Sequence, residues 1–349
     1  MTDKKKDRPF VFVRCMTFNH EAYIKDALNG FVIQQTKFPF VVAIINDAST
    51  DKTKSVINEF VENNCIHNPE IDLRIEEYGT VLDVTVKDNP HCIFHIVHLN
   101  ENHYGKKSKL PYFAKYEHAA KYVAMCEGDD YWTDPLKLQR QVDFLEANPG
   151  YVLCCHRYKI YNQNDGTWNN DSASHILNSY PNGYVFTNKE NLNVGWFTKT
   201  MTLLIRNDAL KNMPNTRGFK YWRDFHMNYY LLKQGGGFCF PFDGAVYRRH
   251  NGSVHSSKSL MDKNKMAYCV AREVWDRNME DKDLLRLIIT LHPTFLEYLR
   301  YKIEKHNFKN LFKEILYFSR MDVKINGIKG VIFSIRKMLL SLCRLLKLK

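Results

Sequence analysis

Three short polar segments of the chain contain the residue types that bind metal ions and phosphates. Thr17–His20, Asn46–Asp51 and Glu127–Trp132 each follow an apolar run that is typical of a buried strand. The second and third segments are rich in carboxylates, which repel one another unless a cation or a hydrogen-bonding ligand offsets their charge. Because hard oxygen ligands suit Mg²⁺ or Mn²⁺, a divalent ion that bridges a diphosphate is the simplest interpretation.

The apolar runs before these segments alternate with helical patterns. We expect strands at residues 10–14, 41–45, 93–99 and 122–126, and helices at residues 20–34, after a Ser49 cap, at 110–121 and from 135. Repeated strand–helix units predict an α/β fold with a doubly wound, mostly parallel sheet and flanking helices. In such sheets ligands bind at the carboxyl ends of the strands, where the polar segments would lie.

The second half of the chain has a weaker pattern. We expect a surface loop at 162–183, a strand at 201–206, a helix at 224–234 and an extended segment at 238–248. From about residue 284 the chain is helical in pattern and increasingly basic, which predicts a helical C-terminal extension.

Several familiar nucleotide sites are excluded. No G-x-G-x-x-G follows the first predicted strand, no G-x-x-x-x-G-K-[ST] occurs, and the glycine-rich opening of nucleotidyltransferases is missing. A metal ion and side chains, rather than a backbone cradle, must therefore meet the charge of a bound diphosphate.

The same segments carry a resemblance to a known family. In chain order, the motifs are Thr17-Phe18-Asn19-His20, Gln34-Gln35-Thr36, Asp47-Ala48-Ser49-Thr50-Asp51, Glu127-Gly128-Asp129-Asp130-Tyr131-Trp132, and Asp134-Pro135 with Lys137-Leu138. Over roughly residues 9–255 the chain resembles family-2 glycosyltransferases of the GT-A fold and of the bacterial surface-polysaccharide type. The resemblance implies an inverting hexosyltransferase or acetylhexosaminyltransferase that uses a nucleotide-diphosphate sugar, often a UDP-sugar, with Mg²⁺ or Mn²⁺.

The resemblance also implies a domain plan. A GT-A domain would occupy residues 1–260, with a nucleotide-sugar-binding half at 9–160 and an acceptor and catalytic half at 161–260. Residues 261–349 would form the helical extension. The acceptor would be a hydroxyl group of a glycan or of a lipid-linked molecule.

Site roles follow by matching motif positions. Thr17 and Asn19 match the loop that meets the nucleotide, and Asp47 matches the acid that contacts its base or ribose. Asp129 and Asp130 match the acidic pair that holds the metal and the diphosphate, and we favour Asp130 as the metal ligand. The physical reason is that cleavage of the sugar–phosphate bond leaves negative charge on the β-phosphate, which a divalent ion stabilises.

Two further positions are predicted in the second half. Asp224 matches the general base that takes the proton of the acceptor hydroxyl, although an acid at a helix start is also favoured by the helix dipole alone. His250, in Tyr247-Arg248-Arg249-His250-Asn251-Gly252, lies in a segment that resembles one closing over the donor or the acceptor.

The sequence also departs from the family pattern. Asn46 stands where an acid is common, and Glu127 stands where the first Asp of the acidic motif is common, so metal choice or nucleotide affinity can differ. The Q-x-x-R-W signature of processive members is absent, which predicts transfer of one sugar per encounter.

The charge of the chain is concentrated at its C-terminal end. The 349 residues have a formal net charge of +12, of which residues 323–349 contribute seven Lys or Arg and no acid. At 100° per residue this tail has a basic side with Arg336, Lys337, Arg344 and Lys347 and an apolar side with Val331, Ile332, Ile335, Met338, Leu339, Leu342, Leu345 and Leu346. Such a helix either docks on the protein's own core or lies on an anionic membrane surface, which is the interpretation we favour.

The cysteines and the N-terminus indicate where the protein is located. The nine cysteines have no C-x-x-C spacing, and the charged N-terminus has no signal-peptide pattern, which together predict a cytoplasmic protein. With the basic tail, we expect it to be peripheral on the inner face of the plasma membrane. The alternatives are a nucleotidyltransferase-like enzyme and a catalytically inert basic protein that binds membranes or nucleic acid. We expect no nucleic-acid partner, because no helix-turn-helix, zinc-finger or RNA-binding signature is present.

Overall fold

The computed structural model describes residues 9–104, 112, 114–194, 198–252 and 259–345. These residues group into two compact units. The first contains the chain up to Asn215 together with Met227–His250, and the second contains Thr216–His226 together with the chain from Asn251 onward.

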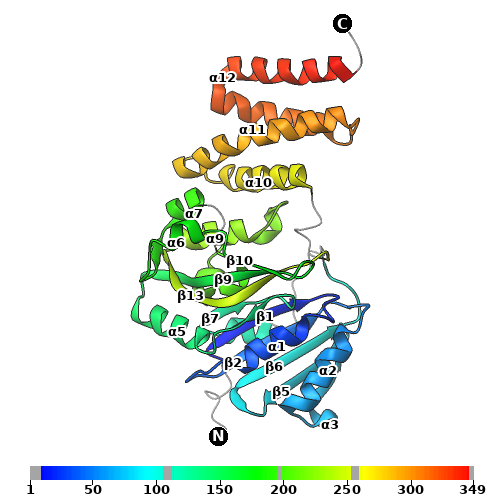
Figure 1. The fold of residues 1–349 in the computed structure, drawn as a ribbon, viewed down its shortest axis with the longest axis vertical. Helices are drawn as coiled ribbons and strands as arrows, with labels where there is room; N and C mark the ends of the chain where they lie inside the picture. The colour runs from blue at the N-terminus through cyan, green and yellow to red at the C-terminus, as the bar shows by residue number, and fades with distance from the viewer. Residues whose placement is uncertain (1–8, 105–111, 113, 195–197, 253–258, 346–349) are drawn as a thin grey trace. The chain divides into compact units, whose positions relative to one another are not determined.

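Four parallel strands form the centre of the sheet in the first unit. They lie in the order β7 (Tyr122–Met125), β1 (Val11–Thr17), β2 (Phe40–Asn46) and β6 (Asn89–Leu99). Helices α1 (Ile24–Val32), α2 (Thr53–Asn64), α4 (Ala114–Ala119) and α5 (Lys137–Ala147) connect or follow these strands (Figure 1). The predicted α/β fold with a mostly parallel central sheet and flanking helices is therefore confirmed.

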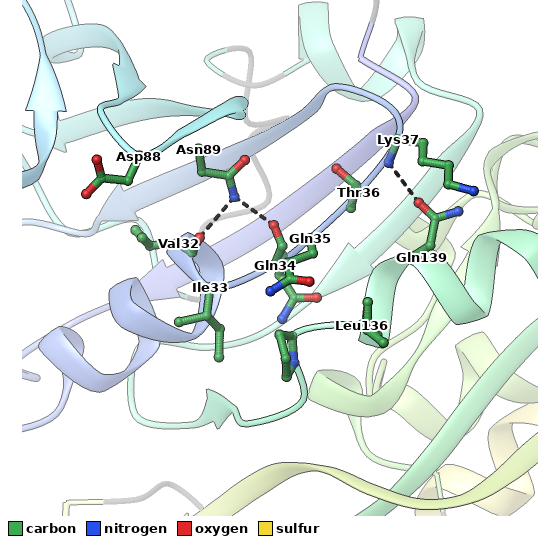
Figure 2. Close-up of a pocket in the computed structure, with 11 residues that line it drawn as sticks. Val32, Ile33, Gln34, Gln35, Thr36, Lys37, Asp88, Asn89, Leu136 and Gln139 are labelled. Carbon is green, nitrogen blue, oxygen red and sulfur yellow. Dashed lines mark hydrogen bonds between the residues drawn. The ribbon is translucent and has the colours of Figure 1, made fainter.

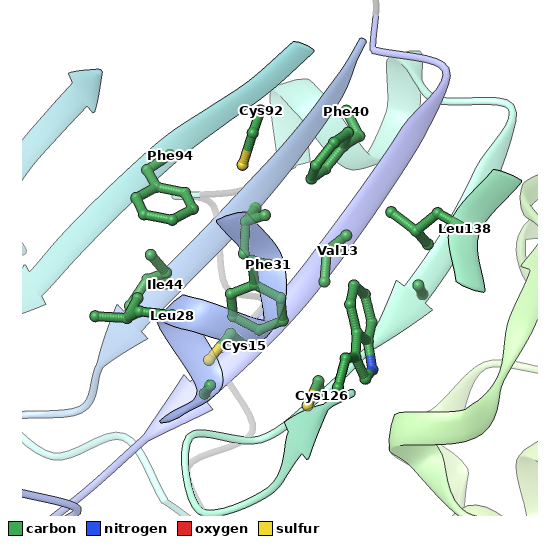
Figure 3. Packing of buried hydrophobic residues seen from close by; sticks show 14 of the residues in the cluster. Val13, Cys15, Leu28, Phe31, Phe40, Ile44, Cys92, Phe94, Cys126 and Leu138 are labelled. Carbon is green, nitrogen blue, oxygen red and sulfur yellow. The ribbon is translucent and has the colours of Figure 1, made fainter. Parts of the chain in front are cut away.

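The core of this unit lies between α1 and the central strands. Leu28 and Phe31 of α1 pack above Val13, Ile44 and neighbouring apolar side chains of the sheet, all fully buried (Figure 3). Both faces of β2 are buried along its whole length, which explains its continuous apolar sequence.

Further strands extend the sheet at both sides, mostly in antiparallel pairs, although one pair on the second side is parallel. β5 (Gly79–Val86) pairs with β6 and carries β3 (Cys65–Ile66) and β4 (Leu73–Glu76), with α3 (Pro69–Asp72) between them. On the other side lie β12 (Leu204–Arg206), β9 (Tyr151–Asn162), β13 (Gly236–Arg249) and β11 (Tyr184–Phe186), with β8 (Tyr131–Trp132) on β13. The short helices η1 (Thr200–Thr202), α7 (Asn188–Val194) and α8 (Asn207–Lys211) connect these strands.

Two local expectations are wrong. The segment 162–183 is not one loop: it contains β10 (Thr167–Asn170), which pairs with β9, and α6 (Ser174–Leu177). Ser49 does not cap α2, because that helix begins only at Thr53, whose main-chain N–H donates to Asp51 Oδ1. Ser49 instead accepts a hydrogen bond from the main-chain N–H of Asn19.

The second unit is helical. It contains η2 (Thr216–Gly218), the start of α9 (Asp224–Leu232), and the helices α10 (Leu260–Trp275), α11 (Lys282–Glu304) and α12 (Leu311–Leu345). The helix α12 is interrupted at Gly327, which has a φ of 69°. Its last part was predicted as the amphipathic tail, of which Leu346 and Lys347 lie outside the described residues. Within the described residues, no helix combines the length and the apolar character needed to cross a bilayer.

Candidate active site

Hydrogen bonds join the loops that follow β1 and β2. The side chain of Asn19 accepts from the main-chain N–H of Thr50 at 2.8 Å, and the N–H of His20 donates to Thr53 Oγ1 at 2.8 Å. Asn19 and Ala48 have positive φ angles of 54° and 55°, which residues with a Cβ atom rarely adopt. Such backbone strain clusters at functional sites, and both positions lie at the carboxyl edge of the sheet. Asn19, predicted to meet the nucleotide, thus holds the two loops together.

Asp47 lies in the second of these loops and is 6% exposed. Its Oδ1 accepts a hydrogen bond from the main-chain N–H of His103 at 2.7 Å, and its own N–H donates to the carbonyl of Thr17 at 2.9 Å. Asp47 therefore connects the ends of β1, β2 and β6. The predicted contact with a nucleotide stays a prediction.

Asp129 lies between two histidines from different parts of the chain. His250 Nε2 lies 3.1 Å and His20 Nε2 lies 3.9 Å from Asp129 Oδ2. Burial alone would raise the pKa of Asp129, but the hydrogen bond with His250 and the charges of both histidines lower it overall. Burial lowers the pKa of His20, against the opposing effect of Asp129. Asp129 is thus held as an anion beside imidazoles whose nitrogens point at the same oxygen.

Thr17 orients one of these histidines. Its Oγ1 lies 3.2 Å from His20 Nδ1, so that the other ring nitrogen, Nε2, faces Asp129. Gly128 allows this arrangement, because a Cβ atom at position 128 would lie 2.6 Å from Thr17 Oγ1. Thr17 is 2% exposed, and in this structure its hydroxyl group positions His20.

Asp130 is almost completely buried, with 4% of its surface exposed. Its Oδ1 accepts a hydrogen bond from the main-chain N–H of Arg248 at 2.8 Å. Burial, followed by the negative charge of Asp129, raises the pKa of Asp130 well above its usual range. The two adjacent acids therefore have opposite pKa shifts, and Asp129 is the more readily ionised of the two.

Arg248 connects the acidic pair to three other elements. Its Nε donates to the carbonyl of Asp129 at 3.0 Å, and its two terminal nitrogens donate to Gln163 Oε1 at 2.8 Å and to Asp26 Oδ2 at 2.5 Å. Its guanidinium group lies over three aromatic rings, those of Tyr23, Tyr131 and Tyr161. These contacts, which we call the Arg248 clamp, hold Asp129 through its carbonyl group. Because Arg248 is two residues before His250, they also hold the segment that carries His250.

Two residues of this site, His20 and Arg248, were not predicted from the sequence as parts of it. His20 stood only within a motif, and Arg248 only beside His250 in the sequence. Arg248 lies near the end of β13 and His250 directly follows that strand, so their two-residue spacing in an extended segment is the signal that places them on one face. Only the fold shows that this face meets Asp129.

Asp224, the predicted base, is the first residue of α9 and belongs to the second unit. The segment before it is fixed on α10 by Glu273, which accepts from the main-chain N–H groups of Lys220 at 2.6 Å and Tyr221 at 2.8 Å. Its catalytic role stays a prediction.

The residues of the first unit fit a divalent metal ion. One ligand atom each from His20, Asp129 and His250 can be chosen so that all three lie within 4.8 Å of one another. Two ligands of one ion at about 2.1 Å lie roughly 3 to 4 Å apart, as the two histidine nitrogens lie from Asp129 Oδ2. Two imidazoles and one carboxylate suit Mn²⁺ better than Mg²⁺, which prefers oxygen ligands.

A separate groove of about 780 Å³ lies at the other edge of the sheet (Figure 2). It is lined by Val32–Lys37, Asp88, Asn89 and residues at the start of α5. Asn89 begins β6, and its side chain donates to the carbonyls of Val32 and Gln34. The groove thus lies at the amino ends of the parallel strands, away from the acidic pair.

Comparison with known proteins gives one family match. Residues 88–249 match the family model described as Glycosyl transferase family 2. The protein Rv1520 of Mycobacterium tuberculosis and the protein Mb1547 of Mycobacterium bovis, both described as uncharacterized, are each 34% identical over 145 residues. The match covers 42% of this chain and only about a third, 34%, of the length of each relative.

Solved structures share the fold. Staphylococcus aureus TarS 1-349 in complex with UDP-GlcNAc has a TM-score of 0.59 and 15% identity, covering 95% of this chain and 89% of that one. The mannosyltransferase PcManGT from Pyrobaculum calidifontis, in complex with GDP-Man and Mn²⁺, has a TM-score of 0.50 and 14% identity, covering 95% and 87%. Both neighbours were solved with a nucleotide-sugar bound. Residues 88–249 of the chain thus match glycosyltransferase family 2, and the chain has the GT-A fold that it shares with these solved structures.

Proposed function

We propose that the protein is an inverting, metal-dependent and non-processive glycosyltransferase. It transfers one hexosyl or acetylhexosaminyl group from a nucleotide-diphosphate sugar, preferably a UDP-sugar, to a hydroxyl group of a glycan or lipid-linked acceptor. The observation that supports this most is the position of Asp129 between His20 and His250, at the carboxyl edge of the parallel strands. The family match and the donor complexes of the two structural neighbours agree with it.

Asp129, His20 and His250 would hold the ion, with Asp130 beside them. When bound, the ion stabilises the negative charge that develops on the β-phosphate as the nucleoside diphosphate leaves. Mn²⁺ fits the two imidazoles better than Mg²⁺ does. This assignment differs from the sequence-based preference for Asp130, because Asp130 Oδ1 already accepts the main-chain N–H of Arg248.

The other residues bind the donor and move the proton. Thr17, Asn19 and Asp47 lie in the two linked loops and would contact the nucleotide. Asp224 would accept the proton of the acceptor hydroxyl as its oxygen attacks the anomeric carbon from the face opposite the leaving phosphate, which inverts the configuration. Residues 9–160 would thus serve mainly the donor, and residues 161–260 the acceptor.

The test of this function uses Asp129→Asn, which keeps the size of the side chain but removes its charge. We expect turnover to fall by at least about 10²-fold, because the proposed metal site loses its ionised ligand. The matched control is Asp143→Asn on the exposed side of α5, which should retain turnover. Full turnover in Asp129→Asn would remove Asp129 from the proposed site.

The acceptor side of the proposal includes an anionic membrane surface on the inner face of the plasma membrane. Several apolar side chains in the last part of α12 are exposed, namely Ile328, Ile332, Phe333, Ile335, Leu339 and Leu340, whereas Met338 is buried. Lys337 lies over the ring of Phe333 at 4.4 Å, and Arg336 is exposed. Apolar side chains next to cations suit the interface of an anionic bilayer.

Vesicle flotation tests this part. Ile332→Glu with Leu339→Glu should abolish co-flotation with vesicles that contain phosphatidylglycerol, while Ile75→Glu, at an 86% exposed position of β4, should not. Equal flotation of the double variant and the wild type would contradict membrane binding through α12.

A further inference from the structure

An exposed tryptophan lies on the short hairpin formed by β9 and β10. Trp168 is 56% exposed, although a tryptophan side chain is usually largely buried. All four residues of β10 are exposed, so the hairpin has no apolar layer of the protein to cover it. The ring of Trp168 packs at its other side against Tyr161, with ring centroids 4.7 Å apart and planes tilted by 37°.

The strand register places Trp168 at the outer end of a row of side chains. Trp168 pairs with Tyr161 across β10 and β9, and Tyr161 pairs with Arg248 across β9 and β13. The guanidinium of Arg248 lies 5.9 Å from the centre of the Tyr161 ring and donates to the carbonyl of Asp129. The row therefore leads from the acidic pair to the exposed indole without a break.

A polar pair lies beside the aromatic pair on the same face of the hairpin. Asn170 pairs with Lys159 two residues along the strands, and its side chain accepts a hydrogen bond from Lys159 Nζ at 2.8 Å. A flat aromatic surface with an amide and an ammonium group beside it matches the two kinds of surface of a pyranose ring, which has an apolar C–H face and a rim of hydroxyl groups. A protein partner would instead call for a wider apolar patch, and among the four residues of β10 only Trp168 is a large apolar side chain.

We propose that Trp168, backed by Tyr161, forms a subsite that binds a pyranose ring of the acceptor glycan. This inference rests on the proposed function, because it assigns the acceptor of that same site to the carbohydrate class. The subsite lies on the acceptor half of the domain plan, on β10 and on the end of β9, which adjoins β13. It would hold a sugar of the acceptor at a distance from the hydroxyl group that reacts, and so favour acceptors with more than one sugar.

Glycan binding and donor cleavage are measured on the same variants. The probe for binding is an array of pyranose mono- to hexasaccharides, and the probe for the proposed function is UDP release from UDP-GlcNAc and other UDP-sugars in the absence of any acceptor. Trp168→Thr removes the indole but keeps strand propensity, and Trp168→Phe keeps an aromatic face. Tyr180→Ala is the matched control, because Tyr180 is 44% exposed and packs on Tyr184 at the same centroid distance of 4.7 Å, but lies outside the row.

The wild type should bind oligosaccharides of the array, and Trp168→Thr should weaken this binding by about tenfold or more. Trp168→Phe and Tyr180→Ala should stay within about threefold, and none of the variants should change UDP release. Unchanged glycan binding in Trp168→Thr, or no bound glycan with the wild type, would overturn the subsite. If the wild type self-associates in sedimentation experiments and Trp168→Thr does not, the subsite would also be overturned. Trp168 would then contact a second copy of the chain and not a glycan. A wild type that binds glycans through Trp168 but cleaves no donor would instead refute the proposed function alone.

Discussion

The main-chain N–H of Arg248 donates a hydrogen bond to Asp130 Oδ1 at 2.8 Å, while the side chain of the same arginine donates to the carbonyl of Asp129. One residue near the end of β13 thereby holds both members of the acidic pair. Because His250 follows two residues later, the same contact sets the distance between His250 and Asp129. The proposed metal ligands thus depend on an arginine that need not touch the ion.

Replacing Arg248 by Lys tests this positioning role. A lysine cannot donate to Asp26, Gln163 and Asp129 in the planar geometry of a guanidinium group, so we expect a loss of roughly 2 to 4 kcal/mol in the free energy of unfolding. Mn²⁺ affinity should fall as well, since His250 and Asp129 separate. Chemical denaturation and metal titration measure the two effects. Arg249→Lys at the exposed neighbouring position is the control. Equal stability and equal Mn²⁺ affinity of the two variants would contradict the positioning role of Arg248.

Replacing His20 by Ala tests the second imidazole ligand. Its loss should weaken Mn²⁺ binding by about 10- to 100-fold and affect Mg²⁺ binding less, because Mg²⁺ gains little from nitrogen ligands. Electron paramagnetic resonance of free Mn²⁺ gives the affinity directly, without turnover. His175→Ala, at an exposed position of α6, should leave the affinity unchanged. The ligand assignment fails if His20→Ala binds Mn²⁺ as tightly as the wild type.

Asp224→Asn separates donor binding from proton transfer. The amide cannot accept the acceptor proton, so transfer should fall by about 10² to 10⁴-fold while affinity for the nucleotide sugar is retained. Asp208→Asn provides the control, because Asp208 also lies in the first turn of a helix and is exposed. Normal transfer in Asp224→Asn would show that another group acts as the base.

Lys137 predicts an unusual pH dependence of stability. It is fully buried, its Nζ donates to Gln141 Oε1 at 2.7 Å, and it lies over the ring of Trp132. Burial lowers the pKa of Lys137 to about 7, whereas the same group in the unfolded chain keeps its proton up to about pH 10.5. Between these values the unfolded state binds more protons, so this group makes stability rise with pH.

The variant Lys137→Met removes this titration. The stability of the wild type relative to Lys137→Met should therefore increase by about 1 kcal/mol per pH unit between about pH 7 and pH 10. Urea denaturation at several pH values measures it. Lys121→Met, in which a half-exposed lysine is removed, should show no such slope. A slope of zero for Lys137→Met would mean that the buried amine does not change its charge in this range.

The fold could be predicted from the sequence where strands are buried on both faces. The runs at 41–45 and 122–126 are continuously apolar, and they became β2 and β7 at the centre of the sheet. By contrast, β4 is exposed along its whole length and β10 likewise, so neither has the apolar pattern by which a strand is recognised. Their pairing with β5 and β9 comes from tertiary contacts that a local pattern does not contain.

The site was predictable in its parts but not in its arrangement. Asp129 and Asp130 stand side by side in the sequence with the same residue type, yet Asp130 turns to the main chain of Arg248 and Asp129 to the histidines. His20 and His250 are far apart in the chain, and only the pairing of β13 with β8 and β9 brings His250 to the end of β7. Spacing alone does not contain this information.

The central claim is that the chain transfers a sugar from a nucleotide-diphosphate donor with a divalent ion. Its most direct test is nucleoside-diphosphate release from a panel of nucleotide sugars, with Mn²⁺ and then with a chelator, for the wild type and for Asp129→Asn. We predict release of UDP from at least one UDP-sugar, its loss with the chelator and its loss in the variant. Release of pyrophosphate, or UDP release that persists unchanged with the chelator and in Asp129→Asn, would contradict the account.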